Sequence, residues 1–300
     1  AAALPTGERA GATVGALLDA VPGDAAARHI VRLRLAGTCA RDLDEVAIAS
    51  FGDVPSFTTS AGPWMRAGGG NQAIALTLAA SLDDVRTGHA VDALEWDAQG
   101  VTARVGGRSE RAEAAVVAVP APIAARLPFS PPLPQDLATA LAALRMGEAS
   151  KFAVATKERP PARSRQSSER SMWCWTANGT GGRARRCVAS FAGSAAAQTS
   201  LGTTRGEVVP WLEALRAMNP DLTFMDEPVL YAWADDPYTL GGYSTWDPQS
   251  WARRAVLARP VGRVAFAGEH TADEQHGTME GALRSGRRAA LQVLESLVGA

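Results

Sequence analysis

The fold is decided by two runs near the end of the chain, Val264-Ala-Phe-Ala-Gly-Glu-His-Thr271 and Gly277-Thr-Met-Glu-Gly-Ala-Leu-Arg-Ser-Gly286. The first run is short and apolar and ends in a glycine, which is typical of a buried strand. Glu269 follows at the carboxyl end of that strand, where open α/β sheets bind their ligands. Thr278 has a side chain suited to cap a helix, so we predict a helix over residues 279–297.

The first turns of this predicted helix are rich in small residues, which allow another backbone to approach closely: Gly281, Ala282, Ser285 and Gly286. The amino terminus of a helix carries about half a positive charge and several unpaired N–H groups. It can therefore hold a carbonyl group or a developing anion. The alternative is a buried strand and a surface helix that bind nothing, as most strand–helix units do.

The rest of the chain mixes strands with helices, which predicts a mixed α/β (α+β) fold. Apolar and polar residues alternate on both sides of a glycine-containing turn, which predicts a β-hairpin of residues 90–96 and 101–105. The apolar run at 114–119 predicts a buried strand. Further strands are expected at 151–155, 172–175, 187–193 and 229–233, helices at 72–82, 135–146, 205–218 and within 1–60, and a polar surface loop at 157–171.

The bulk composition excludes several classes of protein. The formal net charge of the 300 residues is -1, so there is no electrostatic case for nucleic acid or an anionic membrane as partner. No run of 18 apolar residues occurs, and the first residues lack the features of a signal peptide. Three cysteines without a ligand spacing predict a reduced, cytoplasmic protein, although a bridge between Cys174 and Cys187 stays open.

The two closing runs resemble the closing signature of the flavin-containing amine oxidases, the superfamily of monoamine oxidases, polyamine oxidases and histone demethylases. The resemblance extends from about Trp64 to Leu297. It implies an incomplete FAD-binding Rossmann-like domain interleaved with a substrate domain of mixed sheet and helices. On this basis residues 1–62 and 129–257 are expected to form the substrate domain, and residues 63–128 and 258–300 the FAD-binding domain.

The resemblance also implies which residues contact FAD. Gly268 and Glu269 match the contact with the ribityl and pyrophosphate region, and Thr278 and Met279 match positions beside the isoalloxazine. The strand that carries Val91 matches one whose backbone meets the adenine.

One departure from the family pattern concerns attachment of the cofactor. Monoamine oxidases attach FAD through a cysteine, and here Gly242 occupies that position, so we predict non-covalent FAD.

A catalytic role is implied for three residues. Lys151 matches a lysine bonded through water to flavin N5, where a cation assists oxygen reduction. Tyr243 matches one wall of the aromatic cage that flanks the substrate amine, and Trp233 would shape the same cleft. The alternatives are a solvated lysine and a core tyrosine with a satisfied hydroxyl. Thr278 replaces the second cage tyrosine, so the substrate class of monoamine oxidases does not carry over.

His276 lies near the predicted site and is a candidate substrate contact or acid/base group. The alternative is a loop histidine bonded to backbone or water. Glu269, His270, Asp273 and His276 lack a zinc-type spacing such as HExxH, so no metal site is expected.

The βαβ unit with a GxGxxG loop that opens family members is not found in this sequence. Three explanations are open: one chain of a two-chain oxidase, split by proteolysis or encoded separately; a fragment; or a degenerate relative that binds no flavin. The first is favoured because the other flavin-facing motifs are intact. We therefore expect a partner chain that supplies the dinucleotide-binding unit.

The expected reaction is FAD-dependent oxidation of an amine to an imine, which water hydrolyses while oxygen is reduced to peroxide. One alternative is a subunit of an L-amino acid oxidase, which needs an arginine for the substrate carboxylate, with Arg66 as a candidate. The other is a non-catalytic structural or regulatory subunit that keeps the fold.

Overall fold

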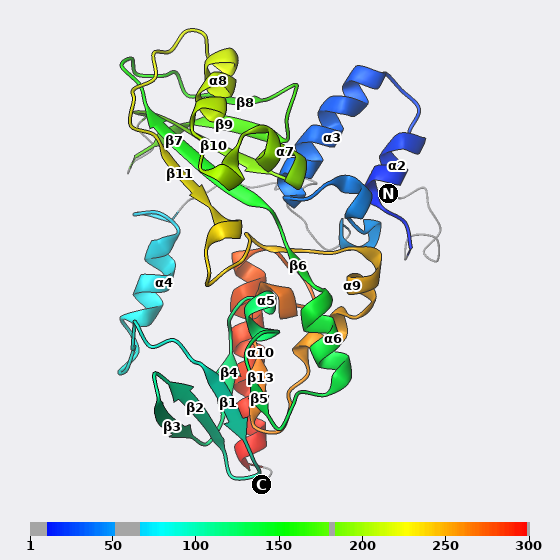
Figure 1. The fold of residues 1–300 in the computed structure, drawn as a ribbon, viewed down its shortest axis with the longest axis vertical. Helices are drawn as coiled ribbons and strands as arrows, with labels where there is room; N and C mark the ends of the chain where they lie inside the picture. The colour runs from blue at the N-terminus through cyan, green and yellow to red at the C-terminus, as the bar shows by residue number, and fades with distance from the viewer. Residues whose placement is uncertain (1–10, 52–66, 180–183, 299–300) are drawn as a thin grey trace.

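A computed structural model describes residues 11–51, 67–179 and 184–298 of the chain (Figure 1). Two halves are visible. One is built on a five-stranded sheet, and the other surrounds the long closing helix α10 (Met279–Val298). We call them the substrate half and the cofactor half, after the expected roles.

The substrate half is an antiparallel sheet in the order β11-β7-β10-β9-β8. Its helices α7 (Ala195–Ser200) and α8 (Val209–Met218) cover one face, where Phe152 stacks on Trp211 with ring centroids 5.3 Å apart. The strands are β7 (Ala149–Ala155), β8 (Ser164–Gln166), β9 (Met172–Asn178), β10 (Ala184–Gly193) and β11 (Val229–Ala232). Side chains alternate between faces along a strand, so β7 buries Phe152 under the helices and turns Lys151 to the opposite face.

That opposite face is approached by helix α3 (Ala25–Cys39), which contacts β9 and β10. Helix α2 (Val14–Ala20) packs on α3 and on the turn η1 (Leu43–Glu45), and a second turn, η2 (Ile48–Phe51), follows. Helices expected within residues 1–60 are therefore confirmed at α2 and α3, whereas the residues after Asp42 form only the short turn η1.

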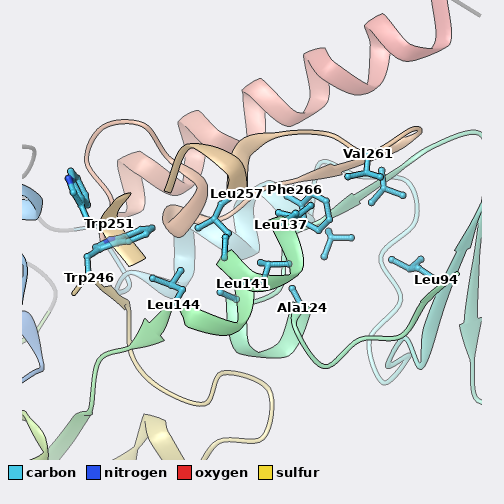
Figure 2. Packing of buried hydrophobic residues seen from close by; sticks show 14 of the residues in the cluster. Leu94, Ala124, Leu137, Leu141, Leu144, Trp246, Trp251, Leu257, Val261 and Phe266 are labelled. Carbon is cyan, nitrogen blue, oxygen red and sulfur yellow. The ribbon is translucent and has the colours of Figure 1, made fainter. Parts of the chain in front are cut away.

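The cofactor half contains the predicted closing motif. Strand β13 (Val264–Phe266) is fully buried and pairs in parallel with β4 (Ala115–Val117), and α10 packs on both. A core of apolar side chains from helix α6 (Gln135–Ala143), helix α9 (Pro248–Ala252) and β13 fills this half (Figure 2). The strand–loop–helix prediction and the mixed α/β fold class are confirmed.

A second sheet in this half has the order β3-β2-β1-β5. Its strands are β1 (Ala93–Trp96), β2 (Val101–Val105), β3 (Arg108–Ala112) and β5 (Phe129–Ser130). The short helix α4 (Gln72–Ala79) precedes the sheet in sequence, and α5 (Ala121–Ala124) lies between β3 and β5. The hairpin of β1 and β2 was predicted. Strand β3 was missed because it is an exposed edge strand without the apolar alternation that marks a half-buried strand.

Several sequence expectations need correction. The helix expected at 135–146 ends at Ala143, because Leu144 is extended and Arg145–Met146 form β6, which pairs with β12 (Ser244–Thr245). The polar stretch 157–171 is not all loop, since β8 adds to the edge of the sheet through backbone pairing with β9. The helix expected from 205 starts at Val209, after the turn η5 (Thr203–Arg205).

The disulfide left open between Cys174 and Cys187 does not form. The two residues lie on neighbouring strands, but Cys174 pairs with Ser190 and Cys187 with Ala155. Both are free thiols, as is Cys39.

Some expectations stay predictions. The domain boundaries at 62/63, 128/129 and 257/258 are not tested by the structure, and Trp64 and Arg66 lie outside the described residues. Among the residues described, no helix has the length and apolar character required to cross a membrane.

Candidate active site

Five aromatic side chains line the sheet face that α3 approaches. This aromatic wall packs around Ala40 and Ala149 and consists of Trp173, Trp175, Phe191, Trp233 and Tyr243. The Trp173 and Phe191 ring centroids are 4.6 Å apart. Sequence reasoning found Trp233 and Tyr243 but missed the other three. The signal was available, because Met172-Trp-Cys-Trp alternates and so turns both tryptophans to one face of the strand.

Lys151 lies in the same face of the sheet. Cross-strand pairing forms one row of Tyr231, Lys151, Phe191 and Trp173, and paired residues share a face. The Lys151 side chain is exposed, and among the described residues it forms no ion pair. The structure thus brings Lys151 beside the wall, and its bond to flavin N5 stays a prediction.

Tyr243 joins the wall to the end of helix α3. Its hydroxyl donates a hydrogen bond to the carbonyl oxygen of Thr38, and burial raises the pKa of the phenol. Burial also raises the pKa of the neighbouring Cys39 thiol to about 12. The Tyr243 backbone is fixed as well, since its carbonyl accepts from Gly147 N–H at 2.6 Å. Both groups therefore stay neutral at physiological pH, and the Tyr243 ring serves as a rigid wall.

Trp233 begins the turn η6 (Trp233–Asp235) directly after β11. Its ring meets Tyr231 edge to face, with centroids 4.6 Å apart. The Trp233 carbonyl accepts from Gly241 N–H at 2.9 Å, which brings the segment before Tyr243 back to the wall.

The carboxylate of Glu269 connects the wall to the closing motif. It is half-buried and accepts three hydrogen bonds: from Ser244 N–H at 2.7 Å, from Ser244 Oγ at 2.6 Å and from Gly277 N–H at 2.5 Å. Burial raises its pKa, and these donors oppose that rise. Glu269 thereby fixes the residue after Tyr243 against the residue before Thr278.

Gly268 must be glycine for two reasons. Its φ of +127° is unfavourable for other residues, and a Cβ there would lie 2.6 Å from Cε1 of the buried His270. Its N–H donates to Ser285 Oγ at 2.9 Å. The loop after β13 is therefore held closely against helix α10.

Thr278 caps α10 as predicted. Its Oγ1 accepts from Gly281 N–H at 3.1 Å and its carbonyl oxygen from Ala282 N–H at 3.1 Å. Met279, the first residue of the helix, is 52% exposed. The first turn of α10 is thus open, as the predicted isoalloxazine contact requires.

The His276 side chain is buried against two tryptophans that are not part of the aromatic wall. Its ring packs edge to face on Trp246 and Trp251, which belong to the core of the cofactor half, with centroids 5.9 and 5.4 Å apart. The guanidinium of Arg254 lies over the Trp251 ring, with its central carbon 3.9 Å from the ring centroid. Burial, with a smaller effect of Arg254, lowers the pKa of His276 to about 4. The ring is therefore neutral, and its role at a substrate stays a prediction.

Val91 is exposed and lies two residues before β1. Among the residues that the structure describes, no group of His, Cys, Asp and Glu could hold a metal ion.

Comparison with known proteins identifies the family. The sequence model of the family described as flavin containing amine oxidoreductase matches residues 9–294 of the chain. The chain belongs to this family. Membership confirms the resemblance seen in the sequence and the prediction of a flavin cofactor, FAD.

This amine oxidoreductase chain is similar to several characterised proteins. It is 30% identical to mouse L-amino-acid oxidase over 203 residues, which cover 61% of this chain and 30% of that protein. It is 35% identical to the histone demethylase-like protein A of Aspergillus fumigatus over 116 residues, 37% of this chain and 11% of that protein. The matches thus span less than a third of these relatives.

The fold is also that of solved amine oxidases. A wild-type putrescine oxidase bound to putrescine superposes with a TM-score of 0.82 at 19% identity, over 98% of this chain and 70% of that one. At this identity the likeness shows the fold alone.

The residues of this amine oxidoreductase fit a non-covalent flavin. A Cβ on Gly242 would lie 2.9 Å from Cβ of Ala149, so a cysteine is not readily accommodated where monoamine oxidases attach FAD. The open first turn of α10 and the loop at Gly268 and Glu269 would hold the ring and ribityl end.

Proposed function

We propose that this chain forms the greater part of an oxidase that uses non-covalent FAD to oxidise the C–N bond of an amine or amino acid. The observation that carries the proposal is the position of Glu269. One half-buried carboxylate joins the residue after Tyr243 to the turn before Thr278. Through this carboxylate, the aromatic wall and the turn that is expected to face the flavin form one rigid unit.

Bound FAD would supply two-electron oxidation, taking a hydride from the carbon next to nitrogen. The wall residues would hold that carbon by apolar contact and exclude water, and Tyr243 would offer its ring face to the amine. The amine nitrogen must be neutral for this step, so it gives up a proton first, and water then hydrolyses the imine product. Lys151 is the exposed cation of the same face and would stabilise negative charge on reduced oxygen, the proposed acceptor.

A GxGxxG loop that would cradle the FAD pyrophosphate does not occur in residues 1–300. We propose that a partner chain supplies it. Support comes from exposed apolar side chains on two elements of the cofactor half: Val116 of β4, and Met279, Leu283, Leu291 and Leu294 of α10.

The test is flavin content and peroxide production of the chain combined with a dinucleotide-binding unit. We expect a bound-flavin absorption spectrum and peroxide release with an amine or amino acid. A colourless complex would overturn the oxidase proposal. Bound flavin with no turnover of any amine or amino acid would favour the non-catalytic alternative.

Glu269→Gln tests the carrying observation. The amide nitrogen of glutamine is a donor, and it would face a backbone or hydroxyl donor that now binds a carboxylate oxygen. Because one of these hydrogen bonds is then lost, we expect the affinity for flavin to fall about 10- to 100-fold. Glu274→Gln is the matched control, because Glu274 lies in the same loop and its exposed carboxylate pairs with exposed Arg284. Equal flavin affinity in the two variants would contradict the role given to Glu269.

A further inference from the structure

Helix α3 brings a cation to the aromatic wall that sequence reasoning did not find. The guanidinium carbon of Arg34 lies 4.5 Å from the centroid of the Trp173 ring. Arg34 is one helical turn before Thr38, whose carbonyl binds the Tyr243 hydroxyl, and its charge is near enough to lower the pKa of that phenol against the larger effect of burial. Arg34 therefore faces the same space as the wall.

The Arg34 side chain has donors to spare. It is exposed, and within residues 11–51, 67–179 and 184–298 no carboxylate pairs with it. Arg32, on the same helix, shows the contrast, since it pairs with both Asp19 and Asp44. A guanidinium has five N–H donors in a planar fork that matches a carboxylate, and here it lies over the face of the Trp173 ring.

Arg34 and Lys151 are two cations beside the aromatic wall. Lys151 lies in the row of paired residues that ends at Trp173, two strands from it, or roughly 10 Å. Two nearby carboxylates already accept hydrogen bonds: Glu269 from three donors, and Asp236 from the Tyr231 hydroxyl and from Tyr238 N–H. Two cations favour a substrate with a negative group and disfavour one with a second ammonium.

We infer that Arg34 binds the carboxylate of the substrate, so that the substrate class is amino acids with an apolar or aromatic side chain. This inference rests on the proposed function and narrows its substrate from an amine or amino acid to an amino acid. The chemistry is unchanged: the C–H and N–H hydrogens of the amino acid leave as hydride to FAD and as a proton, and water converts the imino acid to a keto acid and ammonia. Arg34 acts as a specificity-determining residue.

The test compares L-phenylalanine with 2-phenylethylamine, which differ by the carboxylate alone, on the flavin-loaded protein. We expect a higher kcat/KM for phenylalanine. Arg34→Met should raise the KM for phenylalanine about 10- to 100-fold and leave phenylethylamine within a few-fold. Arg34→Lys should restore part of the loss, since it keeps the charge without the fork. Arg216→Gln, at an exposed arginine of α8 on the other side of the sheet, is the control.

Calorimetric binding of phenylacetate, which needs no turnover, separates this inference from the proposed function. Weaker phenylacetate binding in Arg34→Met than in wild type supports the anion site, whether or not any substrate is oxidised. If binding weakens but no substrate is oxidised, only the proposed function fails. Unchanged phenylacetate binding, or equal losses for phenylalanine and phenylethylamine, would overturn the inference.

Discussion

At the scale of single residues, burial decides the charge state of the titratable groups around the site. Tyr243 and Cys39 are kept protonated, and His276 and His270 are kept neutral, with the pKa of each histidine lowered to about 4. None of these groups changes charge between about pH 6 and pH 8. We therefore expect the pH dependence of turnover in this range to follow the substrate amine, with a rate that rises as the amine loses its proton.

His276 also links stability to pH. Its pKa is about 4 in the folded protein and near the ordinary 6.5 when unfolded, so protons bind the unfolded chain preferentially. The stabilisation is complete above pH 6.5 and is lost as the pH falls towards 4, with a limit of about 3 kcal/mol. Phenylalanine binds no proton, so the His276→Phe variant lacks this loss of stability at low pH. Its free energy of unfolding should therefore fall less between about pH 7.5 and pH 4 than that of wild type. Urea unfolding measures it.

His89→Phe is the control for this pH series, because His89 is exposed on a loop. Parallel curves for wild type and His276→Phe would show that burial does not control the His276 proton.

At the scale of elements, the site depends on close packing of helix α3 on the sheet. Gly37 faces Trp173, and Gly193 of β10 faces Gly37 in turn: a Cβ on Gly193 would lie 2.4 Å from the Gly37 carbonyl oxygen. This close approach brings Arg34 and Thr38 to the aromatic wall. Glycine normally weakens a helix, and here the tertiary contact outweighs that cost.

Gly37→Ala should therefore destabilise the protein despite alanine's higher helix propensity. The new Cβ would lie 3.0 Å from Cζ3 of Trp173 and 3.2 Å from the Ser171 carbonyl oxygen. We expect a loss of about 1–3 kcal/mol in the free energy of unfolding and a higher KM, because the Trp173 ring must shift. Val31→Ala, at an exposed position of the same helix, should change stability little. A Gly37→Ala variant as stable as wild type would contradict the close packing.

At the scale of the whole molecule, the two halves differ in completeness. The substrate half covers one sheet face with two helices and uses the other for the wall. In the described part of the cofactor half, the parallel sheet has only β4 and β13, and the apolar run predicted to be a buried strand leaves Val116 43% exposed. Parallel sheets are normally covered on both faces.

Leu283→Gln tests the proposal that a partner chain covers the exposed face of α10. Leu283 is 51% exposed in this chain. In residues 1–300 alone we expect little change in stability, and after addition of the dinucleotide-binding unit a loss of about 1–3 kcal/mol. Thermal unfolding with and without the unit measures this. Val209→Gln, at an exposed valine of the substrate half, should be neutral in both states. If Leu283→Gln has the same small effect with and without the dinucleotide-binding unit, that unit does not cover this face of α10.

The sequence by itself determined the closing strand–loop–helix, the hairpin, the family and the flavin, because each depends on local pattern: an apolar run, an N-cap, small residues at fixed spacing. It also identified Tyr243 and Trp233 as wall residues.

Only the tertiary structure decided which distant residues share the site. Arg34, Thr38, Trp173 and Phe191 are far from Tyr243 in sequence, and cross-strand register and close helix packing bring them to one face. Tertiary contacts also placed His276 in a tryptophan pocket and made Glu269 the bond between wall and loop. Local pattern sets which elements form, whereas burial and long-range pairing set what each side chain meets.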